Sequence, residues 1–150
     1  MPERFQSVSS AHDWLNSWLS KSAFPVWEKF GIDWESGGFY EKLSVSYKPS
    51  VDPRRTRVVG RQIYCFAQAA KQGWTANAEA CVHLGLKFLM GKSISPEGVA
   101  YSSVHSDGVV ADANFDLYDQ AFALFGLAAA ASAIPEQRDS ILATARNLRD

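Results

Sequence analysis

Hydrophobic residues recur with helical spacing over most of the chain. The first apolar stripe follows Ser9 and Ser10, either of which can cap a helix, and it continues until Pro25 interrupts the pattern. Its members lie mostly three or four residues apart: Ala11, Trp14, Leu15, Trp18 and Leu19. A stripe of this kind predicts a helix that packs one face against a core.

A second helix is predicted from residue 56 to residue 72, ended by Gly73. Val59, Ile63 and Phe66 form its apolar face. The polar stripe on the opposite side consists of Arg57, Arg61, Tyr64, Gln68 and Lys71. The pattern therefore predicts an amphipathic helix with one face on the core.

Three further helices are expected downstream. Thr75 can cap a helix that runs to about Met90, and Asp116 can cap the helix that follows it directly. The helix that begins after Asp116 has no polar side chain from residue 121 to residue 131, so we expect it to be buried on all sides. Pro135 suits the first turn of the last helix, whose apolar residues are Ile141, Leu142, Ala145 and Leu148.

Turn residues separate these helices and predict two β-hairpins. Ser36-Gly37-Gly38 lies between Ile32 and Phe39, and the glycines can adopt the positive φ angles that a tight turn requires. Asp107-Gly108 lies among strand-forming residues between positions 98 and 113. Both hairpins fall in long connections between helices.

The helical segments also repeat. Residues 65–70 line up with residues 124–129, and the same offset lays the third helix on the fifth. The repeating unit is a buried helix, a turn, an outer helix and a connection that contains a hairpin. Such units stack side by side and close into a ring whose inner wall is formed by the apolar helices. We therefore predict an all-α fold with short β-hairpins in the connecting loops.

The last helix indicates that this ring is incomplete. It runs to Asp150 without a glycine or proline stop signal, and no later segment is present to cover its apolar face. We expect residues 1–150 to be an incomplete part of a single domain. A longer protein or a second polypeptide would supply the rest.

Composition, net charge and missing motifs argue against several classes of partner and cofactor. The 150 residues are 47% hydrophobic with a net charge of -1, so neither nucleic acid nor an anionic membrane is an expected partner. No apolar segment follows Met1-Pro2-Glu3-Arg4, and no apolar run approaches the ~20 residues of a membrane span, which favours a cytoplasmic protein. His12, His83 and His105 are scattered, and the chain has no phosphate loop, dinucleotide fingerprint or nucleophile elbow. Neither a metal nor a cofactor is expected.

Polar residues gather at the starts of the two predicted inner helices. Arg57, Arg61 and Tyr64 lie on one helix, and Tyr118 and Asp119 lie in the first turn of the other. The repeat brings these groups to the same end of the ring, where the hairpin connections also lie. A pocket is expected there.

Both groups also have a simpler interpretation. Arg57, Arg61 and Tyr64 can form a solvated helix face. Asp116 and Asp119 stand in the first turn of a helix, where carboxylates cap backbone N–H groups and interact favourably with the helix dipole. The sequence leaves these alternatives open.

Several short motifs occur in a characteristic order. They are Gly31-Ile32-Asp33, Gly37-Gly38-Phe39-Tyr40-Glu41, Arg54-Arg55, Gly60-Arg61-Gln62-Ile63-Tyr64, Gly73-Trp74 and Tyr118-Asp119-Gln120-Ala121-Phe122-Ala123-Leu124. In order and spacing this set resembles bacterial members of the N-acylglucosamine 2-epimerase family. The resemblance implies an (α/α)6 barrel, with residues 1–150 as its N-terminal part, and an enzyme that interconverts sugars at C2.

The resemblance also implies roles for single residues. Arg61 would be the catalytic arginine that stabilises an enediolate, and Tyr118 would hydrogen-bond a sugar hydroxyl. Gln120 departs from the histidine that many relatives carry. Family members move the C2 proton with two histidines of the later half of the barrel, and nothing here matches them, so residues 1–150 alone are expected to be inactive. Further substrate contacts are expected from Asp119, Tyr64 and Arg57.

Three functions remain open. The first is a 2-epimerase or aldose-ketose isomerase acting on a free sugar, with a mannose-isomerase-like activity preferred because residues 54–62 look most like members of that kind. The second is a glycoside hydrolase on an α/α toroid, with Asp119 as one of two paired carboxylates. The third is a non-catalytic helical repeat scaffold. The expected partners are a small-molecule sugar and the remainder of the barrel, and homodimer formation stays open.

Overall fold

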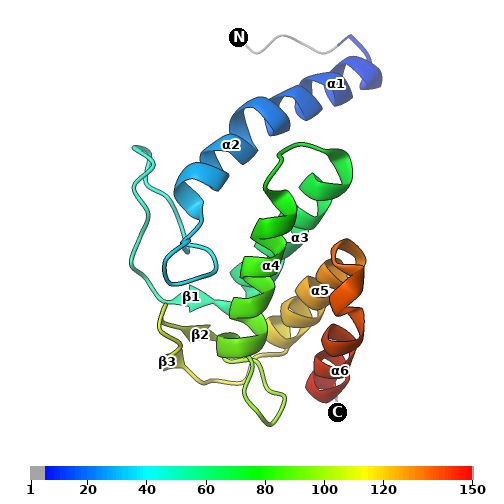
Figure 1. The fold of residues 1–150 in the computed structure, drawn as a ribbon. Helices are drawn as coiled ribbons and strands as arrows, with labels where there is room; N and C mark the ends of the chain where they lie inside the picture. The colour runs from blue at the N-terminus through cyan, green and yellow to red at the C-terminus, as the bar shows by residue number, and fades with distance from the viewer. Residues whose placement is uncertain (1–5, 150) are drawn as a thin grey trace.

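Helices dominate the computed structural model, which describes residues 6–149 and, for Arg149, the backbone alone. Figure 1 shows the helices stacked side by side, with short strands gathered at one end. The predicted all-α fold with small β elements in its connections is confirmed. Residues 1–4, which were used to predict a cytoplasmic protein, and Asp150 lie outside the described residues.

A single helical path opens the chain (Figure 1). It comprises α1 (Val8–Trp18), η1 (Leu19–Ala23), α2 (Phe24–Val26) and η2 (Trp27–Gly31), of which η1 and η2 are π-helical. The cap is Ser7, earlier than predicted. Its hydroxyl accepts the N–H of Ser10 at 3.1 Å, and the Ser10 hydroxyl accepts the N–H of Ser7 at 3.1 Å. This reciprocal pair satisfies two backbone donors at the helix start.

Pro25 does not end this path, so the predicted interruption is wrong. Proline fixes φ near its helical value and lacks one N–H group, which breaks a regular α-helix mainly where an i to i−4 bond is lost. Here the flanking turns are π-helical, and the N–H of Phe24 bonds to the carbonyl of Leu19, five residues back. The wider turn accommodates the proline without stopping the helix.

Two helical hairpins follow, each with an inner and an outer helix. Their elements are α3 (Thr56–Gln72), α4 (Ala78–Phe88) continuing into η3 (Leu89–Ser93), α5 (Leu117–Ala133), η4 (Pro135–Gln137) and α6 (Arg138–Arg149). The inner helices α3 and α5 pack side by side, while α4 packs on α3 and α6 packs on α5 (Figure 1). The predicted repeat of helical hairpins is therefore present. Its register differs from the prediction, because α3 and α5 begin at Thr56 and Leu117, and aligning these starts does not align residues 65–70 with residues 124–129.

Two predicted helix ends downstream are present, and one predicted cap is not. Gly73 ends α3 in the left-handed conformation at φ 67°, and the Asp116 carboxylate accepts the N–H of Tyr118 at 2.9 Å to cap α5. Thr75, however, does not cap α4. Its hydroxyl donates to the carboxylate of Glu28, which ties the turn between α3 and α4 to η2.

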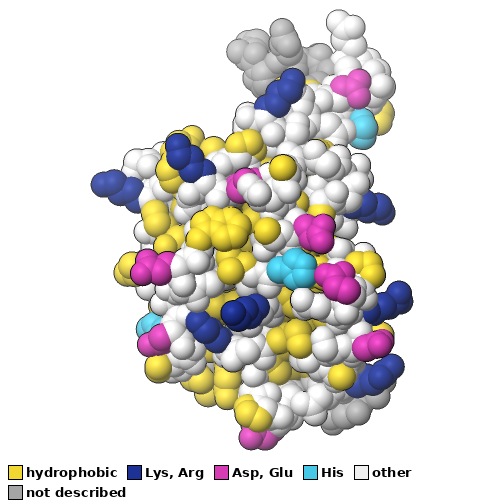
Figure 2. All heavy atoms as spheres, viewed as in Figure 1, with side chains coloured by type: hydrophobic (Ala, Val, Ile, Leu, Met, Phe, Trp, Pro, Cys, Tyr) yellow, Lys and Arg dark blue, Asp and Glu magenta, His cyan; other side chains and the backbone are white. Residues whose placement is uncertain are grey.

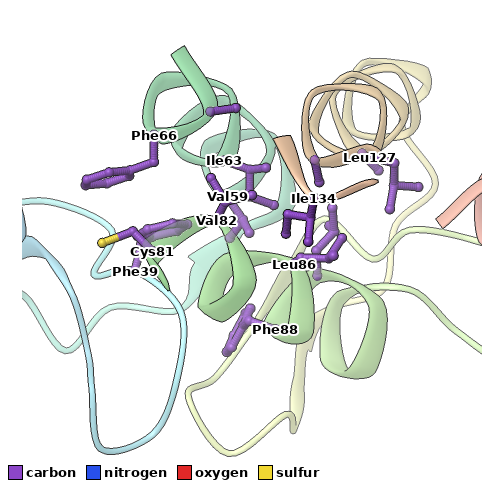
Figure 3. Close-up of a cluster of buried hydrophobic side chains, with 14 of the residues drawn as sticks. Phe39, Val59, Ile63, Phe66, Cys81, Val82, Leu86, Phe88, Leu127 and Ile134 are labelled. Carbon is purple, nitrogen blue, oxygen red and sulfur yellow. The ribbon is translucent and has the colours of Figure 1, made fainter. Parts of the chain in front are cut away.

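The core lies between α3, α4 and α5, as the close-up in Figure 3 shows. Ile63 of α3 and Leu127 of α5 are fully buried, and Phe39 of the first hairpin is 1% exposed. Burial of each such side chain stabilises the fold by about 1.5–3 kcal/mol. The other labelled members are Val59, Phe66, Cys81, Val82, Leu86, Phe88 and Ile134.

Both predicted hairpins are present. Ile32 pairs with Phe39 across a turn in which Gly37 and Gly38 have φ angles of 85° and 81°. In the second hairpin, Gly108 has a φ of 96° and lies between two short strands. The strands β1 (Arg54–Arg55), β2 (Ser103–Val104) and β3 (Val110–Asp112) form one antiparallel sheet in that order. This sheet joins the connection before α3 to the connection before α5.

Three expectations about apolar faces need correction. The face of α6 is covered, because Ile141 and Leu148 pack into the core. By contrast, α5 is exposed along one side, where Phe125 is 40% exposed, since no helix of residues 6–149 lies beyond it. The α1 stripe is also uncovered, and Trp14 and Trp18 are 54% and 46% exposed.

Within residues 6–149, no helix has both the length and the hydrophobicity that crossing a bilayer requires.

Candidate functional site

The inner helices α3 and α5 touch closely because glycines meet at their seam. A Cβ added to Gly126 would lie 2.8 Å from the Cα of Gly60, and a Cβ on Gly60 would overlap the carbonyl of Phe122. Contacts then proceed in the same direction along both helices, from Arg57 with Asp119 to Gly60 with Phe122. The two helices are therefore parallel, and their first turns lie at the same end.

An ion pair joins these first turns. The Nη1 of Arg57 donates to both carboxylate oxygens of Asp119, at 3.1 and 3.0 Å. Asp119 also accepts the backbone N–H of Arg57 at 3.2 Å and the hydroxyl of Ser102 at 2.9 Å. The Asp119 side chain is fully buried, whereas that of Arg57 is 25% exposed. Asp119 thus caps α3 from the neighbouring helix and fixes the register between the two helices.

This geometry changes the role of Asp119. The sequence predicted a direct contact with substrate, or a cap of its own helix. The carboxylate has no exposed surface and four hydrogen bonds, so it positions Arg57 instead of facing a ligand. Ser102, which completes these bonds, was not predicted, because a serine in a loop carries no recognisable pattern.

One turn further along, Arg61 meets Tyr118. The Nη2 of Arg61 donates to the Tyr118 hydroxyl, and the guanidinium lies over the Phe122 ring at 4.1 Å from its centroid. The Arg61 guanidinium is also 5.4 Å from the Tyr118 ring centroid. Two exposed side chains from neighbouring helices are thereby held against each other.

Tyr64 lies further along α3, on the same side of the seam as Arg61. Its ring lies 4.6 Å from the ring of Phe125 on α5. Beyond this pair, a groove of about 570 Å³ runs along the later halves of α3 and α5. The groove is lined by Tyr64, Gln68, Phe125, Ala128 and further residues, and it does not reach Arg61 or Tyr118. At the hairpin end, where a pocket was expected, residues 6–149 contribute two inner helices, α3 and α5.

The polar residues face away from the outer helices. Ile63 of α3 packs against α4, where a Cβ on Gly85 would lie 2.9 Å from the Ile63 side chain. Arg61 is two residues earlier, about 200° around the helix, and is exposed. We call the side of α3 and α5 that carries Arg57, Arg61, Tyr64, Tyr118 and Phe125 the open face. The sequence predicts that this side lines the inside of a ring.

Arg61 differs from the arginines that precede it. Arg54 pairs with Asp33, and Arg55 pairs with Glu41. Arg57 pairs with Asp119, whereas Arg61 has no carboxylate partner within residues 6–149. Its charge is therefore available to an anionic or strongly polar group. Arginine and tyrosine donors suit oxygen atoms of a ligand and do not form a metal-binding set.

Two buried polar contacts support this end of the molecule. Gln120 donates to the carbonyl of Ala100 and accepts its N–H, both at 2.8 Å, so its side chain holds the loop before β2 and does not reach the open face. The Arg54 guanidinium donates to Asp33 and to the carbonyl of Gly37. Burial alone would raise the pKa of Asp33, but hydrogen bonds from the Ser36 backbone and Arg54 hold this pKa below its ordinary value.

Parallel inner helices packed against outer helices are the arrangement of one part of an (α/α)6 barrel, and solved structures share this fold over a part of their length. A cellobiose 2-epimerase from Bacillus thermoamylovorans B4167 matches with a TM-score of 0.84 and 20% identity, over 95% of this chain and 36% of that one. A cellobiose 2-epimerase from Spirochaeta thermophila DSM 6192 gives 0.79 and 22%, over 97% and 37%. A sugar epimerase from a ruminal bacterium gives 0.81 and 22%, over 91% and 35%.

Sequence comparison identifies the family. Residues 38–150 match the N-acylglucosamine 2-epimerase (GlcNAc 2-epimerase) family, and the chain belongs to it. A mannose-6-phosphate isomerase of Rhizobium meliloti (strain 1021) is 38% identical over 135 residues, which are 90% of this chain and 35% of that protein. The chain thus spans about a third of the length of these relatives. The resemblance inferred from the motifs is confirmed.

Proposed function

We propose that the chain forms the N-terminal part of a sugar 2-epimerase or aldose-ketose isomerase that transfers a proton at C2. The proposal rests on the position of Arg61 and on the partners of its side chain. Its guanidinium lies on the open face, is held by Tyr118, and has no carboxylate partner within residues 6–149. A cation left unpaired beside a second inner helix is suited to an oxygen that becomes negative during the reaction.

The chemistry follows from this arrangement. Removal of the C2 proton of an open-chain sugar moves negative charge onto the neighbouring carbonyl oxygen. A fixed guanidinium stabilises that charge without reorganising. The Tyr118 oxygen accepts its hydrogen bond from Arg61, so the Tyr118 O–H remains free to donate to a sugar oxygen. Arg57 and Tyr64 extend the same surface, while Asp119 acts by positioning Arg57.

The relatives support chemistry at C2 of a sugar. The Rhizobium protein is named as an isomerase of mannose 6-phosphate, and two of the structural neighbours are named as 2-epimerases of cellobiose. Both reactions pass through an enediolate when they proceed by proton transfer. We favour the aldose-ketose isomerase, with mannose or a related free sugar as substrate, because the relative at 38% identity is an isomerase.

The uncovered surfaces support completion of the barrel by further helices. Exposed apolar side chains lie on α1, at Trp14 and Trp18, and on α5, at Phe125. These helices lie on opposite sides of the stack (Figure 1). A ring of helical hairpins would cover both, whether a longer chain or a second polypeptide supplies the remaining helices. We call this assembly the complete barrel and assign the C2 base to its later part.

A glycoside hydrolase is less well supported. Such an enzyme needs two carboxyl groups that reach the glycosidic bond. Asp119, the candidate for one of them, is buried and occupied by Arg57 and Ser102. The scaffold interpretation is weakened as well, because Arg61 lies opposite the face that packs on α4.

Product analysis tests the proposal. The complete barrel is incubated with mannose, fructose and cellobiose, and the products are separated by chromatography. We expect mannose and fructose to interconvert, or cellobiose to yield its 2-epimer, and we expect residues 1–150 alone to leave all three unchanged. Release of glucose from cellobiose, or turnover by residues 1–150 at the rate of the complete barrel, would contradict the proposal.

A further inference from the structure

A histidine and two glutamates meet on the outer layer of helices, between α4 and η4. Glu79 and His83 lie four residues apart on α4, and Glu136 belongs to η4 before α6. The Nε2 of His83 is 3.4 Å from Glu136 Oε1 and 4.0 Å from Glu79 Oε1. One ligand atom from each residue lies within 4.8 Å of the other two. Figure 2 shows a histidine with acidic side chains beside it on the face turned toward the viewer.

We propose that this cluster is a binding site for a divalent transition-metal ion, with Zn²⁺ as the ion that fits best. Imidazole nitrogen and carboxylate oxygen are both ligands of Zn²⁺, at about 2.0–2.2 Å. Two ligands of a tetrahedral ion are then roughly 3.3 Å apart. The distance from His83 Nε2 to Glu136 Oε1 is already close to this value, whereas that from His83 Nε2 to Glu79 Oε1 would have to shorten from 4.0 Å. The oxygens of the two glutamates, which lie within 4.8 Å of each other, would also have to approach. Water would take the fourth position.

The other ring nitrogen of His83, Nδ1, also has a hydrogen-bonding partner. The side-chain amide of Gln137 lies 3.2 Å from Nδ1. The nitrogen and oxygen of an amide group exchange places by a flip. With the oxygen toward Nδ1, His83 donates Nδ1–H to Gln137 and directs the Nε2 lone pair at the two glutamates. Histidine ligands of metal ions are commonly held by such an outer hydrogen bond.

The cluster has a simpler alternative, in which His83 only forms ion pairs with the two glutamates. Such exposed pairs contribute little to stability. A dication would in addition relieve the repulsion between the two carboxylates, which lie close together on the surface. The bound ion would link α4 to the start of α6, and so would join one helical hairpin to the next.

This site was not predicted, because none of the three histidines is followed four residues later by a metal ligand. Glu79 precedes His83 by four residues, on the same side of α4. Glu136 is far away in sequence and approaches only through the packing of the hairpins. Both glutamates are exposed and His83 is half-buried, so none of the three belongs to the hydrophobic core.

Calorimetric titration of the chelator-treated full chain with ZnCl₂ at neutral pH tests the proposal. We expect one ion to bind per chain, and His83→Asn to weaken binding at least about tenfold. Glu79→Gln and Glu136→Gln should each weaken it, and Zn²⁺ should raise the Tm of the wild type but not of His83→Asn. The matched control is His12→Asn, which removes a histidine that is 71% exposed on α1. Its affinity should equal that of the wild type.

Cobalt provides an independent measurement. Co²⁺ in place of Zn²⁺ should give the visible absorption of a tetrahedral site, and His83→Asn should abolish it. Absence of binding by the wild type, or unchanged affinity in His83→Asn with circular dichroism like the wild type, would overturn the proposal. The cluster would then be an ion-pair network only.

Discussion

The hydroxyl of Tyr118 accepts a hydrogen bond from the guanidinium of Arg61, although the two residues are 57 positions apart in the sequence. The contact crosses the seam between two inner helices at the point where Gly60 and Gly126 allow their backbones to approach. It joins the polar residues of both helices into one surface. The proposed sugar chemistry depends on this surface.

Loss of the Tyr118 hydroxyl should reduce catalysis without unfolding the protein. Tyr118→Phe keeps the ring beside Phe122 but frees Arg61 and removes a donor to the sugar. We expect kcat/KM of the complete barrel to fall about tenfold, the effect of one hydrogen bond to a charged group. Steady-state kinetics with the preferred sugar measures it. Tyr47→Phe, at a residue with the same 49% exposure, is the control and should retain full activity.

Neutralisation of Asp119 should destabilise the fold. Asp119→Asn leaves the partly buried Arg57 without its counter-ion and weakens the cap of α3. We expect the free energy of unfolding to fall by about 3 kcal/mol, measured by urea denaturation. Asp116→Asn is the matched control, since asparagine caps a helix as well as aspartate does. Equal effects of the two substitutions would show that the ion pair does not hold the inner helices together.

The seam between α3 and α5 should not tolerate a methyl group. A Cβ at position 126 would lie 2.8 Å from the Cα of Gly60, and neither backbone can move aside without disturbing the core. We expect Gly126→Ala to cost about 1–3 kcal/mol of stability. Gly91→Ala in η3 meets no atom within 4 Å and should change stability by less than about 1 kcal/mol. Thermal unfolding of both variants measures the difference.

Acid should remove the contribution of Asp33. Because the folded-state pKa of Asp33 lies below its ordinary 3.8, folding favours the ionised carboxylate. The stabilisation is complete above about pH 3.8 and is lost as the pH falls through the folded-state pKa. Denaturation between pH 2 and pH 7 should therefore show a flatter acid limb for Asp33→Asn than for the wild type. Asp13→Asn, which removes an exposed carboxylate, should keep the wild-type profile.

The inner helices were predictable because their signals are local. Gly73 and Asp116 mark helix ends through their own backbone and capping chemistry, and both act as expected. The Gly37 and Gly108 turns are likewise local. Pro25 misled the prediction, because the π-helical turns around it are not visible as a periodic pattern.

The partners within the candidate site were less predictable. Arg61 and Tyr118 were expected at one end of the ring, but their direct contact depends on how closely the glycines let the helices approach. Asp119 reaches into α3 and pairs with Arg57, which no spacing within one helix can indicate. Long-range contacts of this kind follow from packing and not from periodicity.

Exchange of solvent deuterium into C2 of mannose is the most direct test of the role of Arg61. It is followed by NMR in D₂O with the complete barrel. We expect the wild type to incorporate deuterium at C2, Arg61→Met to do so at least about 100-fold more slowly, and Lys87→Met, which removes an exposed cation of α4, to match the wild type. Undiminished exchange in Arg61→Met, or no exchange in the wild type, would contradict the account.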